Sequence, residues 1–255
     1  MMISQLFGHN NYTRFIILSR SRTGSNYLRG LLNSHKGIIV YSEFFKSNAS
    51  IEWGFPGYND NGSRLALFQN DPVAFLDKWV FQKYPRHTEA VGFKLFYYHA
   101  RDGKWSVVWP HLQNDTGIKI IHLKRKNILE THLSRQRAML TDKWANITGE
   151  KEAQPAVQII YEECLQDFVQ TRTWEQDNEE YFSQHPMMNV YYEDLAGDYQ
   201  VKMKEIQEFL GVTPVPVAPQ TFKQATLPLS RSITNYWELK EKFTGTPWEP
   251  FFTDD

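Results

Sequence analysis

The sequence predicts an α/β protein of three layers, in which helices flank a central, mainly parallel sheet. Apolar runs of strand length recur along the chain and are continuous rather than alternating, which is typical of strands buried on both faces. Helical patterns lie between these runs, and this alternation predicts parallel strands joined by right-handed crossovers. The runs are FIIL (15–18), GIIVY (37–41), AVGFKLF (90–96), IKIIHL (118–123) and MNVYY (188–192).

The predicted helices carry recognisable start and stop signals. Asp71 followed by Pro72 is a suitable N-cap and first-turn pair. Asn127 with Glu130 three residues later resembles a capping box. The predicted helices begin near Ser25 and near Asp71, and span Asn127 to about Leu140, Val157 to Tyr181, and Asp198 to Leu210 with a stop at Gly211.

Three segments are predicted to be irregular. Residues 46–70 and 211–228 are rich in Gly, Pro, Asn and Ser, and the stretch from Pro228 onward is aromatic with weak periodicity. Long loops in a compact domain usually act as lids or binding walls. The aromatic segments 51–58 and 236–252 are therefore candidates for a wall that receives sugar rings or a flat lipid-like substrate, although their Trp and Phe residues equally suit a core.

Bulk composition limits the classes of function. The 255 residues are 41% hydrophobic, enough for one substantial core, so we predict a single domain over residues 1–255. A net charge of -1 argues against broad nucleic-acid binding. The lone Cys164 excludes an internal disulfide and is predicted to be a buried helical residue, and no Cys/His spacing suggests a structural metal. Without a signal-peptide pattern or an apolar run near the ~20 residues that span a bilayer, we expect a cytoplasmic protein; its oligomeric state stays open.

The loop after the first apolar run is a candidate anion site. In FIILSRSRTGSNYLRGLLNSH (15–35), a strand leads through Arg22 and Gly24 into a helix that begins near Ser25. A helix N-terminus offers free N–H groups and a partial positive charge, so phosphate or sulfate fits there. The loop lacks the G-x-x-x-x-G-K-[ST] pattern of nucleotide triphosphatases. An ordinary turn with exposed arginines is the alternative.

Two segments of the chain resemble motifs of the PAPS-dependent sulfotransferase family, especially its bacterial carbohydrate-type branch: Arg22 to Asn26 and HLKRKNILETHLSRQRA (122–138). PAPS is 3′-phosphoadenosine 5′-phosphosulfate. The family has a 5′-phosphosulfate loop after its first strand and a second element, strand then Arg then helix with Ser, for the 3′-phosphate. The resemblance implies a P-loop-like fold and transfer of a sulfuryl group from PAPS to a hydroxyl, leaving PAP. Shorter matches are 42–45, 92–94, 192–195 and 230–243, so it spans nearly the whole chain.

The resemblance implies roles for residues that match the family's motifs. Arg22 would lie against the phosphosulfate, and the donors around it would come from Thr23, Gly24, Ser25 and Asn26. Arg125 and Ser134 would bind the 3′-phosphate. Many members place the Ser eight residues after the Arg, which would select Lys126 instead; Arg125 is favoured because Arg binds phosphate with two bonds.

The remaining candidates surround the reacting atoms. Glu43 ends the second strand at the same sheet edge as Arg22, and the resemblance implies a general base there; neutralising a nearby Arg is the alternative. His99 is the rival base, or a packed histidine. Lys94, within an apolar strand, needs a charged partner, either the donor's sulfate or a carboxylate.

Two positions further along the chain complete the candidate donor site. Tyr192 ends the fifth strand and would pack near the adenine or in the core. Ser230, Arg231 and Asn235 resemble the family's C-terminal donor-binding loop, in which Arg231 would contact the 3′-phosphate; an exposed Arg231 that only aids solubility is the alternative.

The leading hypothesis is a sulfotransferase acting on a carbohydrate or other small-molecule hydroxyl. A nucleotide-dependent kinase of related architecture is disfavoured because the Lys-[ST] pair and a clear magnesium-binding carboxylate are missing. A non-catalytic module that binds PAP or another anion is the third possibility. The sequence does not identify the acceptor.

Overall fold

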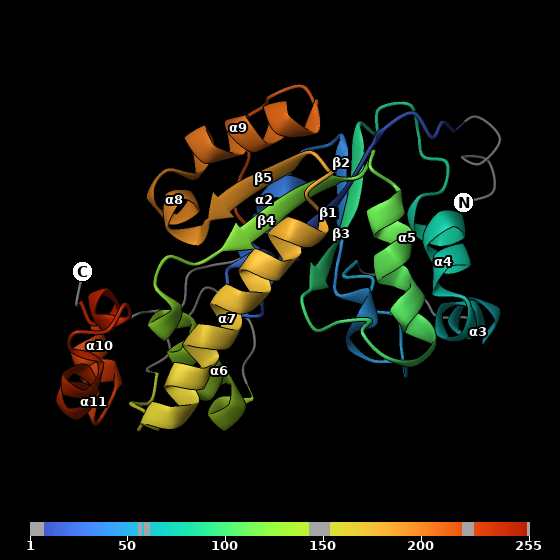
Figure 1. The fold of residues 1–255 in the computed structure, drawn as a ribbon. Coiled ribbons are helices and arrows are strands. Elements are labelled where there is room, and N and C mark those ends of the chain that lie inside the picture. Colours follow the sequence, from blue (N-terminus) through green and yellow to red (C-terminus); the bar gives the residue numbers. More distant parts are fainter. Residues whose placement is uncertain (1–7, 56–57, 59–61, 143–153, 221–226, 254–255) are drawn as a thin grey trace.

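A computed structural model describes residues 8–55, 58, 62–142, 154–220 and 227–253 (Figure 1). Its centre is a sheet of five strands, all parallel, in the order β2-β3-β1-β4-β5. The predicted α/β class and all five predicted strands are therefore confirmed. The strands are β1 (Thr13–Ser19), β2 (Ile38–Tyr41), β3 (Ala90–Phe96), β4 (Lys119–Lys124) and β5 (Met187–Tyr191).

Side chains of each strand point alternately to the two faces of the sheet and create a core on each. On one face Phe15 and Ile17 pack with α2 (Ser25–Asn33), α8 (Tyr192–Gly197) and α9 (Tyr199–Leu210). On the other, Ile16 and Leu18 pack with α3 (Gly62–Asn70), α4 (Pro72–Phe75) and α5 (Val108–Asn114). Figure 1 shows α9 and α5 on opposite sides of the strands, which are the flanking layers that the sequence predicts.

A third core lies beyond the carboxyl ends of the strands. It joins α6 (Ile128–Thr141) and α7 (Tyr161–Tyr181) to α10 (Leu229–Ser232) and α11 (Tyr236–Phe243). The stretch after Pro228 is thus largely helical, and its prediction as irregular was wrong. Tyr236, Leu239 and Phe243 lie on one face of α11 and are buried, so a short apolar stripe suffices when neighbouring helices cover it.

Local chemistry explains where the helices begin and end. Asn127 accepts a hydrogen bond from the Leu129 N–H at 3.0 Å and caps α6, whereas Glu130 binds Arg125, so the predicted capping box does not close. α7 begins at Tyr161 rather than at the predicted Val157, because Val157 pairs with Ile233 in a short parallel bridge. Asp198 caps α9, and Gly211 ends it with a φ of 76°, both as predicted.

Other elements were not predicted or were predicted only in part. α3 occupies the end of the segment 46–70 that was expected to be irregular, and α5 and α8 are also additions. The helix predicted from Asp71 continues from α4 as a wider turn over Leu76–Val80. Short 3-10 turns cover Phe44–Lys46, Gly103–Val107 and Glu249–Phe251. In the segment 211–228, residues 221–226 lie outside the described residues.

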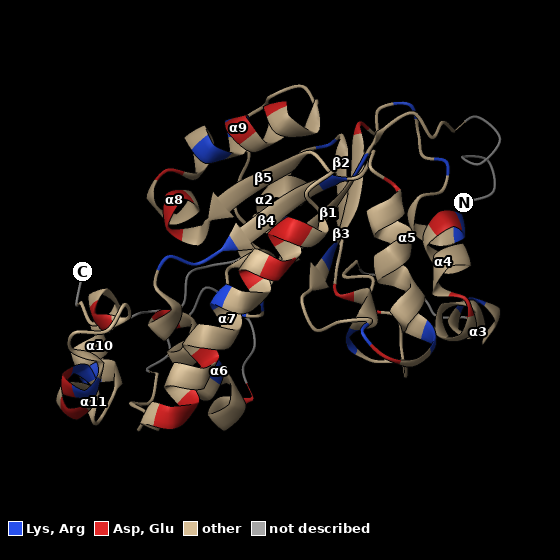
Figure 2. Cartoon of the chain, viewed as in Figure 1, with Lys and Arg blue, Asp and Glu red and all other residues tan. Residues whose placement is uncertain are grey.

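Charge is distributed unevenly over the helices. Figure 2 shows Asp and Glu along much of α7, whereas the strands are mostly uncharged. Cys164 is buried on α7, as predicted, and burial raises the pKa of its thiol. Among the residues that the structure describes, no helix is long and apolar enough to cross a membrane.

Candidate active site

The sheet topology creates a crevice at the carboxyl ends of β1 and β4. These strands are neighbours, but the chain leaves β1 toward β2 at one edge of the sheet and leaves β4 toward β5 at the other. Ligands of open parallel sheets bind where adjacent connections diverge in this way. Arg22 follows β1 and Arg125 follows β4, so the two predicted anion-binding elements flank this crevice.

The loop after β1 turns sharply into α2. Arg22 and Gly24 both have left-handed backbone conformations, with φ of 67° and 87°. Gly24 is the N-cap of α2, so no side chain of the described residues caps this helix, and its first turn carries no acidic residue. The first N–H groups of α2 therefore face the loop without a capping oxygen, as an anion-binding helix N-terminus requires.

Tyr192 packs directly on Gly24. A Cβ added at Gly24 would lie 2.2 Å from Tyr192 Cδ2, so no larger residue fits unless the tyrosine moves. The guanidinium of Arg125 lies over the same tyrosine ring, 4.3 Å from its centroid. The predicted Tyr192 therefore joins the loop after β1 to the segment after β4.

Arg22, Ser134 and Arg125 lie close together, and the contact between Arg22 and Ser134 was not predicted. Arg22 Nε donates to Ser134 Oγ on α6 at 2.9 Å, and Arg125 Nη1 lies 3.5 Å from the Arg22 carbonyl oxygen. Burial lowers the pKa of Arg22, and the charges of Arg125 and Arg135 lower it further. Several like charges confined in a partly buried loop favour binding of an anion.

Arg125 and Lys126 point in different directions. The Arg125 side chain is 12% exposed, pairs with Glu130 and lies 3.5 Å from a Glu193 carboxylate oxygen. The Lys126 side chain is 55% exposed and pairs with Asp194 at 2.6 Å. Arg125 thus lines the crevice beside the loop, whereas Lys126 reaches toward solvent.

Lys94 links the start of α2 to the segment after β2. Its ammonium, fully buried, donates to Asn26 Oδ1 and to Glu43 Oε1, each at 2.6 Å, and lies 3.5 Å from Ser25 Oγ. These oxygens give all three ammonium protons an acceptor. Burial lowers the pKa of Lys94, and the Glu43 carboxylate opposes that effect. Of the two partners expected for Lys94, the carboxylate is present in the structure.

His99 lies near the same group but is held neutral. It is 6% exposed and packs on Phe96 with ring centroids 4.9 Å apart. Burial lowers the pKa of His99 to about 4, against the opposing charge of Glu43. Within the described part of the chain, no group hydrogen-bonds its buried Nδ1.

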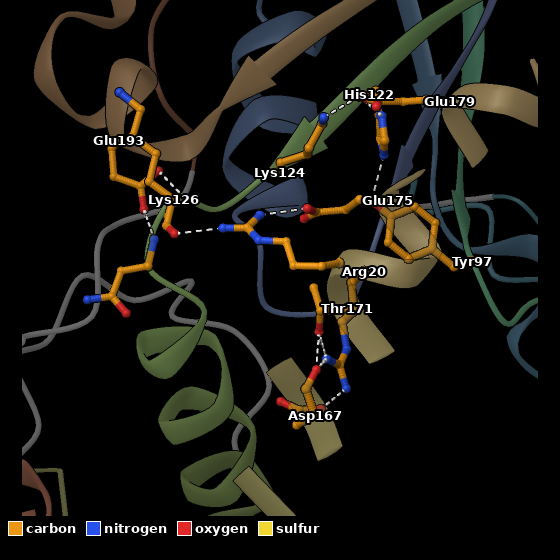
Figure 3. A network of polar contacts seen from close by, with 12 residues as sticks. Arg20, Tyr97, His122, Lys124, Lys126, Asp167, Thr171, Glu175, Glu179 and Glu193 are labelled. Carbon is orange, nitrogen blue, oxygen red and sulfur yellow. Dashed lines mark hydrogen bonds and ion pairs between the residues drawn. The ribbon is translucent and has the colours of Figure 1, made fainter. Parts of the chain in front are cut away.

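A charge network on α7 anchors the loop after β1, and no pattern in the sequence predicted this network. Figure 3 shows Arg20 directed at Asp167 and Thr171. Asp167 also binds Arg135 and accepts a bond from His132 Nδ1 at 2.9 Å. Burial raises the pKa of Asp167, but these partners outweigh it and hold that pKa well below the usual range.

The same network continues under the crevice. In Figure 3, Lys124 at the end of β4 points at Glu179 of α7, and the Tyr97 hydroxyl meets His122 Nε2 at 2.7 Å. Burial lowers the pKa of His122 to about 3, so this buried imidazole is neutral. α7 therefore ties together the segments that follow β1, β3 and β4.

The candidate residues near the C-terminus differ from one another in their surroundings. Arg231 is exposed on α10. Asn235 exchanges bonds of 3.0 and 2.9 Å with the backbone of Ile159, so it fastens the C-terminal helices to the start of α7. Of the candidate aromatic wall, Trp53 is buried in the core, whereas Trp237 is 69% exposed. In the described ranges, no group of three or more His, Cys, Asp or Glu side chains is arranged to hold a metal.

The chain is similar in sequence to a known protein family and to named relatives. A family model described as a sulfotransferase domain matches residues 12–227. Nodulation protein H of Rhizobium tropici is 26% identical over 248 residues, covering 94% of this chain and 93% of that protein. The protein of the same name from Rhizobium meliloti strain 1021 is 25% identical over 249 residues, covering 93% and 94%. A crystal structure of a sulfotransferase from Alicyclobacillus acidocaldarius aligns with a TM-score of 0.49 at 15% identity, over 94% of this chain and 92% of that one.

Proposed function

Because this chain belongs to the sulfotransferase domain family, and is therefore a sulfotransferase, we propose that it moves the sulfuryl group of PAPS to a hydroxyl of a carbohydrate or small-molecule acceptor. The observation that carries the proposal is the contact of Lys94 with both Asn26, at the start of α2, and Glu43. It brings an anion-binding helix N-terminus, a cation and a carboxylate to one point at the sheet edge.

The residues of the crevice fit such a donor. PAPS, when bound, supplies the activated sulfuryl group and a phosphate leaving group. Backbone N–H groups from Gly24 to Asn26 and the guanidinium of Arg22 provide donors for its 5′ end. Arg125 and Ser134 stand on the other side of Arg22 and suit a second phosphate. Burial of Arg125 beside the loop favours it over the exposed Lys126 for that role.

Glu43 is the proposed general base. Its carboxylate takes the proton of the acceptor hydroxyl, while Lys94 and Arg22 stabilise negative charge that develops on the leaving phosphate. The Glu43 side chain is 17% exposed, so it can meet an acceptor that enters from solvent. His99 is the weaker candidate because it is only 6% exposed and its ring packs on Phe96, which leaves it less accessible to an acceptor than Glu43.

A first experiment tests donor binding and the base together. PAP is titrated into the protein by calorimetry without Mg²⁺, and transfer from labelled PAPS is measured with a panel of sugars and alcohols. We expect PAP to bind, Glu43→Gln to lose turnover by roughly a hundredfold or more while keeping PAP affinity, and His99→Gln to keep most turnover. Full turnover by Glu43→Gln together with its loss in His99→Gln would reverse the assignment of the base.

The 3′-phosphate assignment has its own test. Arg125→Ala is expected to weaken PAP by roughly tenfold or more, and to weaken adenosine 5′-phosphosulfate, which lacks the 3′-phosphate, far less. Lys126→Ala serves as the matched control and should change neither. Equal losses for the two ligands would remove Arg125 from that phosphate. ATP binding that requires Mg²⁺, with no affinity for PAP, would instead support the kinase alternative.

A further inference from the structure

Tyr98 follows β3 at the carboxyl edge of the sheet and keeps 42% of its surface exposed. Single exposed aromatic residues are common on proteins, so exposure alone indicates no function. Its surroundings distinguish Tyr98, because its ring is held by neighbours from separate elements. A fixed, exposed ring at the mouth of the site is suited to binding.

Three rings hold the aromatic part of Tyr98. Its centroid lies 5.8 Å from Phe96, 5.2 Å from His99 and 5.7 Å from Trp174 of α7. Trp174 is itself fixed, because the guanidinium of Arg20 lies 5.3 Å from its ring. Contacts at these distances and tilted angles are favourable for aromatic pairs. Tyr98 therefore presents its remaining surface in one orientation.

Tyr98 also lies beside the proposed reacting centre, because Phe96, on which its ring packs, has its centroid 5.4 Å from the Nζ of Lys94. Lys94 in turn donates to Glu43 Oε1 at 2.6 Å. Burial raises the pKa of Tyr98, and the charge of Glu43 raises it further. Tyr98 therefore packs on the ring that borders the pair formed by Lys94 and the proposed base, and a phenol with a raised pKa is uncharged at neutral pH.

The geometry of the reaction determines which part of the acceptor lies near Tyr98. In an in-line transfer the acceptor oxygen lies between Glu43 and the sulfuryl group, so the rest of the acceptor extends toward solvent. Tyr98 is the exposed ring beside that path. A pyranose ring has hydroxyls at its edge and an apolar C–H face, and aromatic side chains commonly line sites for molecules of this mixed character.

We propose that Tyr98 contacts the acceptor directly by receiving the apolar face of a sugar ring, with Trp174 holding Tyr98 in place. This inference rests on the proposed sulfuryl transfer and adds an acceptor class to it. It predicts a preference for pyranosides over open-chain alditols, which carry similar hydroxyls without a flat apolar face. Tyr98 acts on the acceptor and not on the donor.

The test measures acceptor KM and PAP affinity separately. With labelled PAPS and a panel of methyl pyranosides and open-chain alditols, wild type should prefer the pyranosides. Tyr98→Ala should raise the KM of the best pyranoside roughly tenfold, about 1.4 kcal/mol, which is the size of one aromatic contact. PAP affinity should change less than about twofold. Tyr98→Phe, which keeps the ring and loses only the hydroxyl, should leave both values near wild type.

Val201→Ala is the control, because Val201 is 57% exposed on α9 and belongs to no candidate binding segment, and it should change neither quantity. An unchanged KM in Tyr98→Ala, an equal preference for alditols, or sulfuryl transfer from PAPS with no pyranoside accepted would overturn the inference alone. Weaker PAP binding in both Tyr98 variants would do so as well, because Tyr98 would then serve the donor loop. Absence of PAP binding by wild type would overturn the proposed function itself.

Discussion

The ion pair between Lys94 and Glu43 predicts a stability change that depends on pH. In Glu43→Gln, the fully buried ammonium of Lys94 loses its carboxylate partner. Removing one member of a buried pair costs about 3–5 kcal/mol, because the other charge is left uncompensated. The Glu43 side chain is 17% exposed, and glutamine keeps an oxygen that accepts a bond from Lys94. We therefore expect a smaller loss, about 2 kcal/mol in the free energy of unfolding at pH 7.

The sign of the pH dependence follows from the pKa of Lys94. Burial lowers that pKa from 10.5, and Glu43 opposes the lowering, so the pKa falls further in the variant. Between the folded pKa and 10.5 the unfolded chain binds more protons than the native protein, so the stability of each protein rises with pH. Once pH exceeds the wild-type folded pKa, Lys94 is neutral in both proteins. The difference in the free energy of unfolding between wild type and Glu43→Gln is then lost.

The assay is urea denaturation of wild type and Glu43→Gln at pH 7 and pH 10.5. We expect the gap of about 2 kcal/mol at pH 7 to fall below about 0.5 kcal/mol at pH 10.5. Glu238→Gln is the control, because Glu238 pairs with Lys242 at 2.9 Å on an exposed helix and should change stability little at either pH. A gap of the same size at both values of pH would refute the reasoning, since it would not arise from the charge on Lys94.

Two further predictions concern the support of the loop after β1. Asp167→Asn leaves Arg20 and Arg135 without their carboxylate and should lower the free energy of unfolding by about 3 kcal/mol at pH 7. The partners of Asp167 outweigh burial and hold its pKa low, so this contribution to stability is present above about pH 4 and is lost only as pH falls through the folded pKa. Denaturation midpoints of wild type and Asp167→Asn across acid pH measure it. A stability difference between the two proteins that disappears near pH 6 contradicts the prediction. Gly24→Ala, at a φ of 87° with a Cβ 2.2 Å from Tyr192, should lose about 2 kcal/mol of stability and weaken PAP. Adding Tyr192→Ala should recover part of the steric loss, and strictly additive effects in thermal denaturation would show that Tyr192 is not the obstacle.

The strands were predictable because their apolar runs are local features of the sequence. β3 has the bounds that AVGFKLF indicates, and the caps Asn127 and Asp198 start their helices as predicted. The position of β1 between β3 and β4 depends on tertiary packing, which the sequence does not display. α11 was missed because its apolar stripe is short and becomes stable only against α6 and α7.

The candidate site was likewise predictable from the sequence only in part. An isolated Lys94 in an apolar strand required a partner, and that requirement was visible; the choice of Glu43 and Asn26 came from the fold. The resemblance implied that Arg125 and Ser134 bind one phosphate, whereas the contact between Arg22 and Ser134 came from the fold. Asp167 lies on a helix far from Arg20 in the chain and belongs to no motif. The fold alone brings it to that arginine.

The central position of β1 also determines when the site can exist during folding. Phe15 of β1 lies opposite Gly92 of β3 on one side and Lys119 of β4 on the other, so both neighbours join from far along the chain. Closing such long loops costs entropy before any sheet contact is gained, and topologies dominated by distant pairs fold slowly. The crevice forms only when β4 has docked and α6 has brought Ser134 to Arg22. Recovery of PAP binding after dilution from urea would thus report the last steps of folding rather than the first.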